Sequence, residues 1–148
     1  MATHYQGTKQ EKQALDANIK LLRGAESVAA RLAQELRDDN LTISHFGSLE
    51  ALLHLGPMSQ RQLGQKLLKS SGNITMVIDN LEKRGLVQRQ RDTQDRRVVT
   101  VHLTTDGRHL IETIFPRHVN DIVAEMALLT PEEQSTLGQL CRKVGLGK

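Results

Sequence analysis

The sequence predicts a mainly α-helical protein with one small β-hairpin. Over most of the 148 residues the apolar side chains recur three and four positions apart, the spacing that gives a helix one apolar face. In one stretch, residues 86–91 and 98–103, the pattern changes to the alternation typical of two short strands joined by a polar loop. The chain contains only three aromatic residues, so we expect an aliphatic core.

The helix just before this hairpin has two contrasting faces. Four apolar residues between positions 74 and 81 form a stripe that predicts burial. The opposite face carries short, mostly hydrogen-bonding side chains of a kind that can approach base edges in the major groove of DNA. These side chains are Ser71, Asn73, Thr75, Met76, Asp79 and Asn80. Gly85 is a suitable residue to end the helix.

Positive charge is concentrated at the hairpin. Residues 83–97 contain six Lys or Arg and two Asp, a local charge of +4, whereas the whole chain carries +3, so the remaining residues sum to −1. A helix with a polar face followed by a basic hairpin tip is the charge distribution expected of a winged helix on DNA. Asp92 and Asp95 would oppose phosphates if unpaired, so we expect salt bridges within the wing.

Helical patterns precede this unit. Residues 1–12 are polar, and we expect them to be frayed. The first helical pattern covers residues 13–37, and Asp38-Asp39-Asn40 interrupts it before a second pattern over residues 41–55.

A helix-turn-helix follows from the next capping signals. Ser59 and Gln62 have the spacing of a capping box and open a short helix. Ser70 or Ser71 then caps the polar-faced helix. Two short helices joined by a tight turn, the second with a polar face, are typical of a helix-turn-helix. With the hairpin as a small β wing, the predicted fold is a winged helix-turn-helix.

Two more helices are predicted after the hairpin. Thr104 caps a long helix that contains Pro116, where we expect a kink because proline removes a backbone hydrogen bond. Thr130-Pro131-Glu132-Glu133 then starts a last helix with threonine at the cap, proline in the first turn and glutamate at the third position.

The two ends of the chain are expected to hold a homodimer. Residues 13–37 carry an apolar seam, and the last helix has an apolar face made of Leu137, Leu140, Cys141 and Val144. The alternative for the first helix is packing on its own domain alone. We divide the chain into an N-terminal dimerisation helix (1–37), a DNA-binding domain (38–104) and C-terminal dimerisation helices (105–148).

No catalytic or metal-ligating pattern is present in the sequence. It has no phosphate-cradling glycine loop, no nucleophile elbow and no acid and base at fixed spacing, so we expect neither an enzyme nor a cofactor. The six histidines lack metal-ligand spacing. No apolar run approaches the roughly 20 residues that span a bilayer, and the N-terminus is not signal-like, which predicts a cytoplasmic protein.

Cys141 is the only cysteine and admits two interpretations. Its position between Leu140 and Val144 on a helix stripe predicts a buried apolar-face residue. A redox-sensing cysteine needs a thiol with a lowered pKa and access to solvent. The only basic residues next to Cys141 in the sequence are Arg142 and Lys143. A redox-sensing repressor acting through Cys141 therefore stands as an alternative.

Three segments resemble the multiple antibiotic resistance regulator (MarR) family of bacterial transcription factors. They are LGQKLLKSSGNITMVIDNLEKRGLV, the loop DTQDRR and the following LTTDGRHL. The resemblance covers residues 13–144. It implies a homodimer whose N- and C-terminal helices interleave, while each winged helix-turn-helix binds a half-site of a palindrome in double-stranded DNA. Peroxide-sensing members keep a reactive cysteine near the N-terminus, where this sequence has none.

The resemblance also implies the DNA contacts. It places the start of the polar-faced helix near bases or phosphates, and it places two arginines at the wing, with Asp95 holding one guanidinium. The expected DNA-binding residues are Ser70, Ser71, Asn73, Ile74, Thr75, Arg84, Arg91, Asp95, Arg96 and Arg97. The alternatives are a solvated turn for the arginines, an ordinary helix surface for Asn73 and Thr75, and a winged-helix module that binds an acidic protein partner.

The stretch IFPRHVNDI resembles the branch of the family that responds to quinones and phenols. Phe46, Phe115 and His118 are the residues that we expect to line a site for such a ligand. A small aromatic molecule there could change the spacing of the two recognition helices without touching DNA. The alternative is that the three residues belong only to the core.

Overall fold

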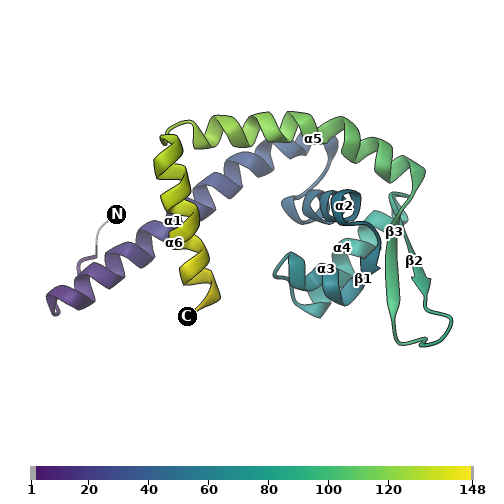
Figure 1. Ribbon diagram of the computed structural model, residues 1–148, viewed down its shortest axis with the longest axis horizontal. Coiled ribbons are helices and arrows are strands. Elements are labelled where there is room, and N and C mark those ends of the chain that lie inside the picture. Colours follow the sequence, from purple (N-terminus) through teal and green to yellow (C-terminus); the bar gives the residue numbers. More distant parts are fainter. Residues whose placement is uncertain (1–2, 148) are drawn as a thin grey trace.

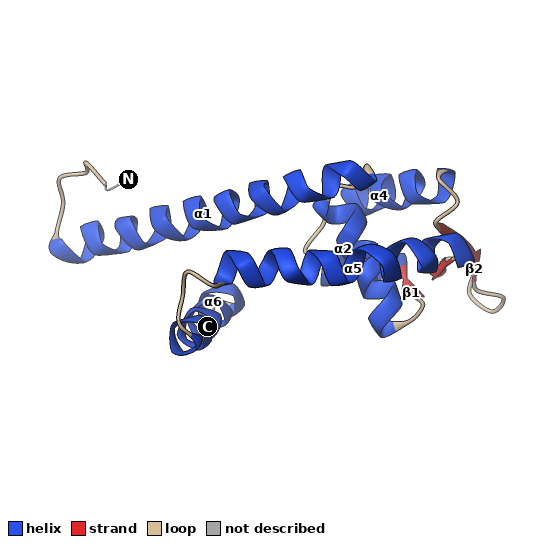
Figure 2. Ribbon diagram, turned by 90° about the horizontal axis from the view of Figure 1, so that it is seen from above, coloured by secondary structure: helices blue, strands red, loops and turns tan. Residues whose placement is uncertain are grey.

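The computed structural model describes residues 3–147 and confirms a mainly helical fold with a small sheet (Figure 1). In chain order the elements are α1 (Lys9–Leu36), the 3-10 helix η1 (Arg37–Asp39), α2 (Ile43–Leu55), β1 (Met58–Ser59), α3 (Gln60–Lys66), α4 (Ser71–Lys83), β2 (Val87–Arg91), β3 (Val99–Leu103), α5 (Thr105–Met126) and α6 (Pro131–Leu146). The predicted winged helix-turn-helix is α2, α3, α4 and the sheet, and α1 and α6 extend away from it (Figures 1 and 2).

Side-chain caps begin most helices where the sequence predicts. Four predicted capping residues each accept a hydrogen bond from a backbone N–H of the first turn: Ser59, Ser70, Thr104 and Thr130. The first helix differs, because Thr8 and Glu11 form a capping box and α1 begins at Lys9. The prediction that residues 1–12 are frayed is therefore wrong for residues 9–12.

The sheet is antiparallel with β3 in the centre. β2 pairs with β3 so that Val87 lies opposite Leu103 and Arg91 opposite Val99, which confirms the predicted hairpin. Gly85 takes a positive φ of 72°, a conformation that glycine adopts without strain, between α4 and β2. The two-residue strand β1 was not predicted, because it is too short to show an alternating pattern.

The core is aliphatic and crosses the predicted domain boundaries. Its fully buried residues include Leu49 of α2, Ile78 of α4 and Val101 of β3. Leu36 at the end of α1 and Ile111 in the first half of α5 belong to the same cluster. The first half of α5 therefore packs with the winged helix, and the division at residues 37 and 104 stays a prediction.

The start of α5 is fixed against the base of the hairpin. The backbone N–H of Thr104 donates to the carbonyl of Leu86, and the Thr104 hydroxyl donates to the carbonyl of Gly85. Gly107 approaches the Leu86 carbonyl so closely that a Cβ there would overlap its oxygen. α5 then continues through Pro116 as one helix from Thr105 to Met126.

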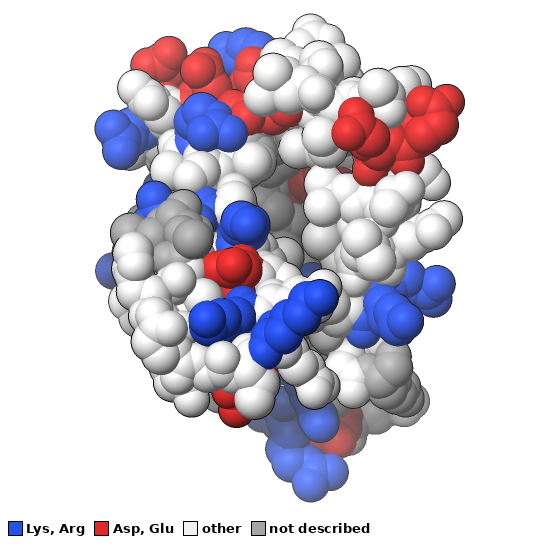
Figure 3. All heavy atoms as spheres, turned by 90° about the vertical axis from the view of Figure 1, so that its left-hand side faces the viewer, with Lys and Arg blue, Asp and Glu red and all other residues white. Residues whose placement is uncertain are grey.

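The other end of the molecule leaves apolar side chains uncovered. No residue of α6 is buried, and Leu140 and Val144 are 56% and 63% exposed. Cys141 is exposed, so its predicted burial is wrong for the single chain. Figure 3 views the molecule from the side that carries the start of α1 and α6, and there acidic and basic side chains are interspersed with uncharged ones. This end is not a basic surface.

Two further findings hold for residues 3–147. None of their helices has the length and apolar character needed to cross a membrane. Among the same residues, no three His, Cys, Asp or Glu side chains gather where they could hold a metal ion.

Candidate nucleic-acid interface

The second helix of the helix-turn-helix, α4, has one buried face and one exposed face. Ile74, Ile78 and Leu81 are at most 2% exposed and hold the helix on the core. On the outer side Met76 is 71% exposed, and Asn73 is also exposed. The side chain of Ile74 lies in the core, and its role as a DNA-binding residue stays a prediction.

The hydroxyl of Thr75 is engaged within the protein. It donates to the carbonyl of Ser71 at 2.7 Å and accepts a hydrogen bond from Nε2 of Gln60 at 2.8 Å. A hydroxyl has one proton to donate, and this one is already used. The structure makes Thr75 a link between α3 and α4, and its contact with DNA stays a prediction.

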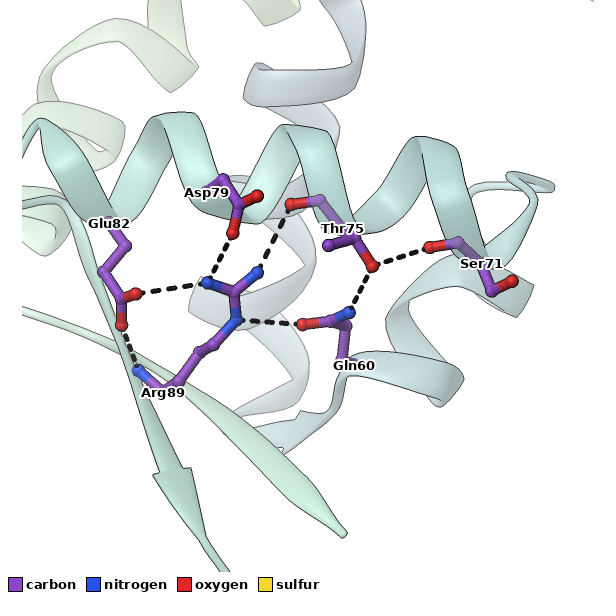
Figure 4. Close-up of polar contacts among 6 residues, drawn as sticks. All are labelled: Gln60, Ser71, Thr75, Asp79, Glu82 and Arg89. Atoms are coloured by element: carbon purple, nitrogen blue, oxygen red, sulfur yellow. Dashed lines mark hydrogen bonds and ion pairs between the residues drawn. The ribbon is translucent and has the colours of Figure 1, made fainter. Parts of the chain in front are cut away.

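Arg89 of β2 is the centre of a polar network that ties the wing to α4 and α3 (Figure 4). Its Nη1 contacts Oδ1 of Asp79 at 2.7 Å and Oε1 of Glu82 at 3.1 Å. Its Nε donates to Oε1 of Gln60 at 3.0 Å, and its Nη2 donates to the carbonyl of Thr75 at 3.3 Å. Sequence reasoning counted Arg89 only as one of the basic residues of the hairpin. The missed signal was its position on the same strand face as the buried Val87.

The wing loop is held by its two aspartates. Oδ1 of Asp92 accepts hydrogen bonds from the backbone N–H groups of Gln94 and Asp95, and these bonds lower the pKa of Asp92. Asp95 accepts from Nε and Nη2 of Arg97, and the guanidinium lowers the pKa of Asp95. The salt bridge expected at Asp95 is confirmed, whereas the one expected at Asp92 is wrong because backbone amides take its place.

The wing arginines remain exposed to solvent. The side chain of Arg97 is 91% exposed although it is paired with Asp95. Arg91 donates from Nη1 to the carbonyl of Arg96 at 2.9 Å and so helps to close the loop. The guanidinium of Arg97 is thus oriented in advance while both wing-tip arginines stay accessible.

A groove beside α4 brings further cations next to the predicted residues. It has a volume of about 760 Å³, and its polar and charged lining residues are Ser59, Gln60, Arg61, Gln65, Lys69, Ser71, Asp95 and Arg97. Three of these are cations and one is an anion, so the groove suits a polyanion. Arg61 and Lys69 were missed because they lie outside the stretch of concentrated charge, and only the fold brings them to Arg97.

Arg84 lies at the opposite end of α4 from the groove. Its Nη1 donates to the carbonyl of Asn40 at 2.8 Å, and its Nη2 donates to the carbonyl of Asp39 at 3.4 Å. Arg117 of α5 pairs with the carboxylate of the same Asp39. Arg84 therefore joins α4 to the corner at η1 and, through it, to α5, and its role in DNA contact stays a prediction.

Phe46, Phe115 and His118 come together between α2 and α5, as the proposed ligand site requires. The ring centroids of Phe46 and His118 are 4.0 Å apart, and those of the two phenylalanines are 6.4 Å apart with nearly parallel planes. Phe46 and His118 are buried, and within residues 3–147 Nδ1 of His118 has no hydrogen-bond partner. The rings pack on one another, so a ligand entering here must separate them.

Lowering the pH should destabilise the protein through His118. Burial lowers the pKa of His118 from the ordinary value of 6.5, against the opposing influence of Asp121 and Glu50. Below pH 6.5 the unfolded chain therefore binds more protons than the folded one, and the free energy of unfolding falls as the pH falls. Urea denaturation at pH 7.5 and 5.5 should show a smaller fall for His118→Phe than for the wild type. His109→Phe, at an exposed position of α5, is the control, and equal falls in His118→Phe and the wild type would contradict the assignment.

Comparison with known proteins places this geometry in a family. The profile of the MarR family matches residues 41–99, from α2 to the start of β3. The HTH-type transcriptional regulator YkoM of Bacillus subtilis is 36% identical over 84% of this chain and 80% of its own. Among solved structures, AbsC, a MarR family transcriptional regulator from Streptomyces coelicolor, has a TM-score of 0.85 at 21% identity, with 97% of each chain covered.

A second solved structure has higher identity. BpsR of Bordetella bronchiseptica, described in terms of the regulation of its DNA binding by 6-hydroxynicotinic acid, has a TM-score of 0.80 at 29% identity over 87% of this chain and 98% of its own. These relatives are transcriptional regulators and not enzymes. They favour DNA over an acidic protein as the partner of the winged helix. The chain belongs to the MarR family of DNA-binding transcriptional regulators.

Proposed function

We propose that this regulator is a homodimeric repressor that reads an inverted-repeat operator with α4 and the wing, and that a small aromatic molecule modulates its DNA affinity. The observation that carries the proposal is the separation of two surfaces. The exposed face of α4, the basic groove and the wing arginines lie on one body, whereas the uncovered apolar side chains of α1 and α6 lie away from it (Figure 1).

For DNA we propose two kinds of contact. The exposed side chains at the start of α4, Ser71 and Asn73, approach base edges, and Ser70 caps the helix end that faces the phosphates. Phosphates are contacted by the wing and groove cations, which are Arg61, Lys69, Arg91, Arg96 and Arg97. Asp95 does not contact DNA itself, because its carboxylate orients Arg97.

Arg97→Gln should weaken binding to every sequence and make it less sensitive to salt. Each phosphate contact that is lost reduces the slope of log K against log salt by about 0.9. Asn73→Ala should instead relax the preference at one base position and leave the slope unchanged, because it removes no charge. Fluorescence anisotropy between 50 and 200 mM KCl, on a duplex selected by the wild type and on a scrambled one, measures both. An unchanged salt slope in Arg97→Gln would show that the wing does not contact the phosphates.

The dimer proposal is supported by α6. A helix of 16 residues without a buried side chain is marginal in water, so an apolar face that is this exposed calls for a partner. The exposed apolar residues of α1 and α6 include Leu15, Leu22, Leu137, Leu140 and Val144. Two copies related by a two-fold axis would bury these faces and would set two recognition helices roughly 34–36 Å apart, one turn of DNA.

Leu140→Asp should convert the dimer to a monomer, because it places a charge on the apolar face of α6. Sedimentation equilibrium measures the mass, and DNA affinity should fall together with it. Gln139→Asp adds the same charge at an exposed position on the opposite side of the helix and should leave the dimer intact. A Leu140→Asp variant that sediments as a dimer would exclude α6 from the interface.

The ligand proposal rests on the ring cluster and on the path from it to α4. The hydroxyl of a phenol could donate to the unpaired Nδ1 of His118, and a carbonyl of a quinone could accept from it when Nδ1 carries the proton. α5 carries Phe115 and His118, and it also carries Arg117, which pairs with Asp39 at the corner after α1. Arg84 of α4 donates a hydrogen bond to the same corner. A coupling free energy of about 1–3 kcal/mol along this path changes DNA affinity by about 5- to 150-fold. Regulation of DNA binding by 6-hydroxynicotinic acid in the structural relative BpsR supports an aromatic effector.

Titrating the DNA complex with hydroquinone, salicylate and 6-hydroxynicotinic acid tests the ligand site. We expect release by one of these compounds from the wild type and from Cys141→Ser alike, and weaker release from His118→Phe. Release that is lost in Cys141→Ser would make Cys141 the sensor, as in the redox alternative. Equal release from His118→Phe and the wild type would exclude the ring cluster.

A further inference from the structure

We propose that Arg89 is a positioning residue for sequence recognition, which fixes the rotation of α4 about its own axis and neutralises its acidic side without touching DNA. The proposal rests on the proposed use of α4 as the recognition helix. It assigns a function to the one arginine of the hairpin whose guanidinium is turned into the protein, with only 22% of its side chain exposed.

The geometry gives α4 a second line of attachment. Its buried residues Ile74, Ile78 and Leu81 hold one face on the core. The groups that meet Arg89 belong to Thr75, Asp79 and Glu82, which lie at i, i+4 and i+7 on the neighbouring face. Apolar contacts are non-directional, so a single apolar face permits small rotations of a helix. Directional polar contacts along a second face, about 100° around the axis, remove that freedom.

Arg89 also links the three elements that approach DNA. From β2 it reaches α4 through both carboxylates, and its backbone N–H donates to Oε2 of Glu82 at 2.9 Å. It reaches α3 through Gln60, whose amide in turn donates to the hydroxyl of Thr75 (Figure 4). The wing, the recognition helix and the helix before it thus share one guanidinium. A planar group with five donors can make these contacts together, which a lysine ammonium cannot.

The charges on α4 give Arg89 a second effect. Asp79 and Glu82 have side chains that are 50% and 40% exposed on the helix that is to approach phosphates. Left unpaired, two carboxylates per protomer would repel the DNA backbone. Arg89 pairs with both, so the helix presents Ser71, Asn73 and Met76 to DNA without an uncompensated acidic group beside them.

Arg89→Gln, Arg89→Lys and Arg97→Gln separate positioning from direct contact. Anisotropy with the selected and scrambled duplexes measures two quantities: the ratio of the two affinities and the salt slope. Arg89→Gln should lower the ratio at least tenfold and keep the wild-type slope on scrambled DNA, because no phosphate contact is lost. Arg97→Gln should instead keep the wild-type ratio of affinities and reduce the salt slope. Arg89→Lys keeps the charge without the planar fork and should also lower the ratio, though by less.

A shallower slope in Arg89→Gln, by about 0.9 per lost contact, would show that Arg89 touches phosphate and would overturn the proposal. A wild-type ratio in Arg89→Lys would overturn the role of the fork. Adding Asp79→Asn to Arg89→Gln should recover affinity for scrambled DNA but not the ratio, and recovery of the ratio would reduce Arg89 to charge neutralisation. Arg108→Gln, on the surface of α5, is the matched charge control.

A measurement without DNA keeps this inference separate from the proposed operator. Amide hydrogen exchange of α4 should become faster in Arg89→Gln, while exchange of α2, which Arg89 does not contact, should stay as in the wild type. Unchanged exchange in α4 would overturn the positioning role, whatever the DNA preference. A wild type that selects no sequence, together with faster exchange in α4, would instead count against the proposed function alone.

Discussion

Burial of one face of α4 in the aliphatic core is the constraint on which the rest of the structure depends. Removing one large aliphatic side chain from such a core costs about 2–5 kcal/mol, a large share of the roughly 5–15 kcal/mol that holds a domain folded. Because Ile74, Ile78 and Leu81 must face inward, the helix has only one way to present its polar residues. The same core receives Leu36 and Ile111, so the long helices are positioned by the residues that position α4.

Two sets of polar contacts hold α4 in addition to its buried face, and they serve different purposes. Ser70 at its start and the Arg89 network, which runs along one side from Thr75 to Glu82, set how the helix meets the groove and the wing. At its end, Arg84 connects it to the corner at η1, which Arg117 connects to α5. The first set suits reading of DNA, and the second suits transmission of a movement of α5.

The sequence predicted most of the fold because its signals are local. Capping residues and apolar spacing lie within a few positions of one another, so Ser59, Ser70 and Thr130 marked helix starts correctly. The Thr8 and Glu11 pair carried the same signal and was overlooked, and the two residues of β1 carried none.

The candidate site was only partly predictable from the sequence, because several of its residues contact partners that lie far away in the chain. Ile74 reads both as part of the apolar stripe and as an early residue of the helix, and only packing decides between these two roles. Arg84 and Arg89 both count as basic residues in the sequence, yet Arg84 meets carbonyls 44 and 45 residues away, and Arg89 meets Gln60, 29 residues away. A sequence shows which residues are charged, but it does not show which groups they contact in the fold.

Photocross-linking from the outer face of α4 tests the central claim most directly. In a Cys141→Ser background, an azidophenacyl group attached at Met76→Cys, which replaces a 71% exposed side chain, should cross-link to the selected duplex. The account predicts cross-links at two positions related by two-fold symmetry and about one helical turn apart, and none from Leu128→Cys at the exposed turn before α6. Cross-links from position 128 with none from position 76 would contradict it.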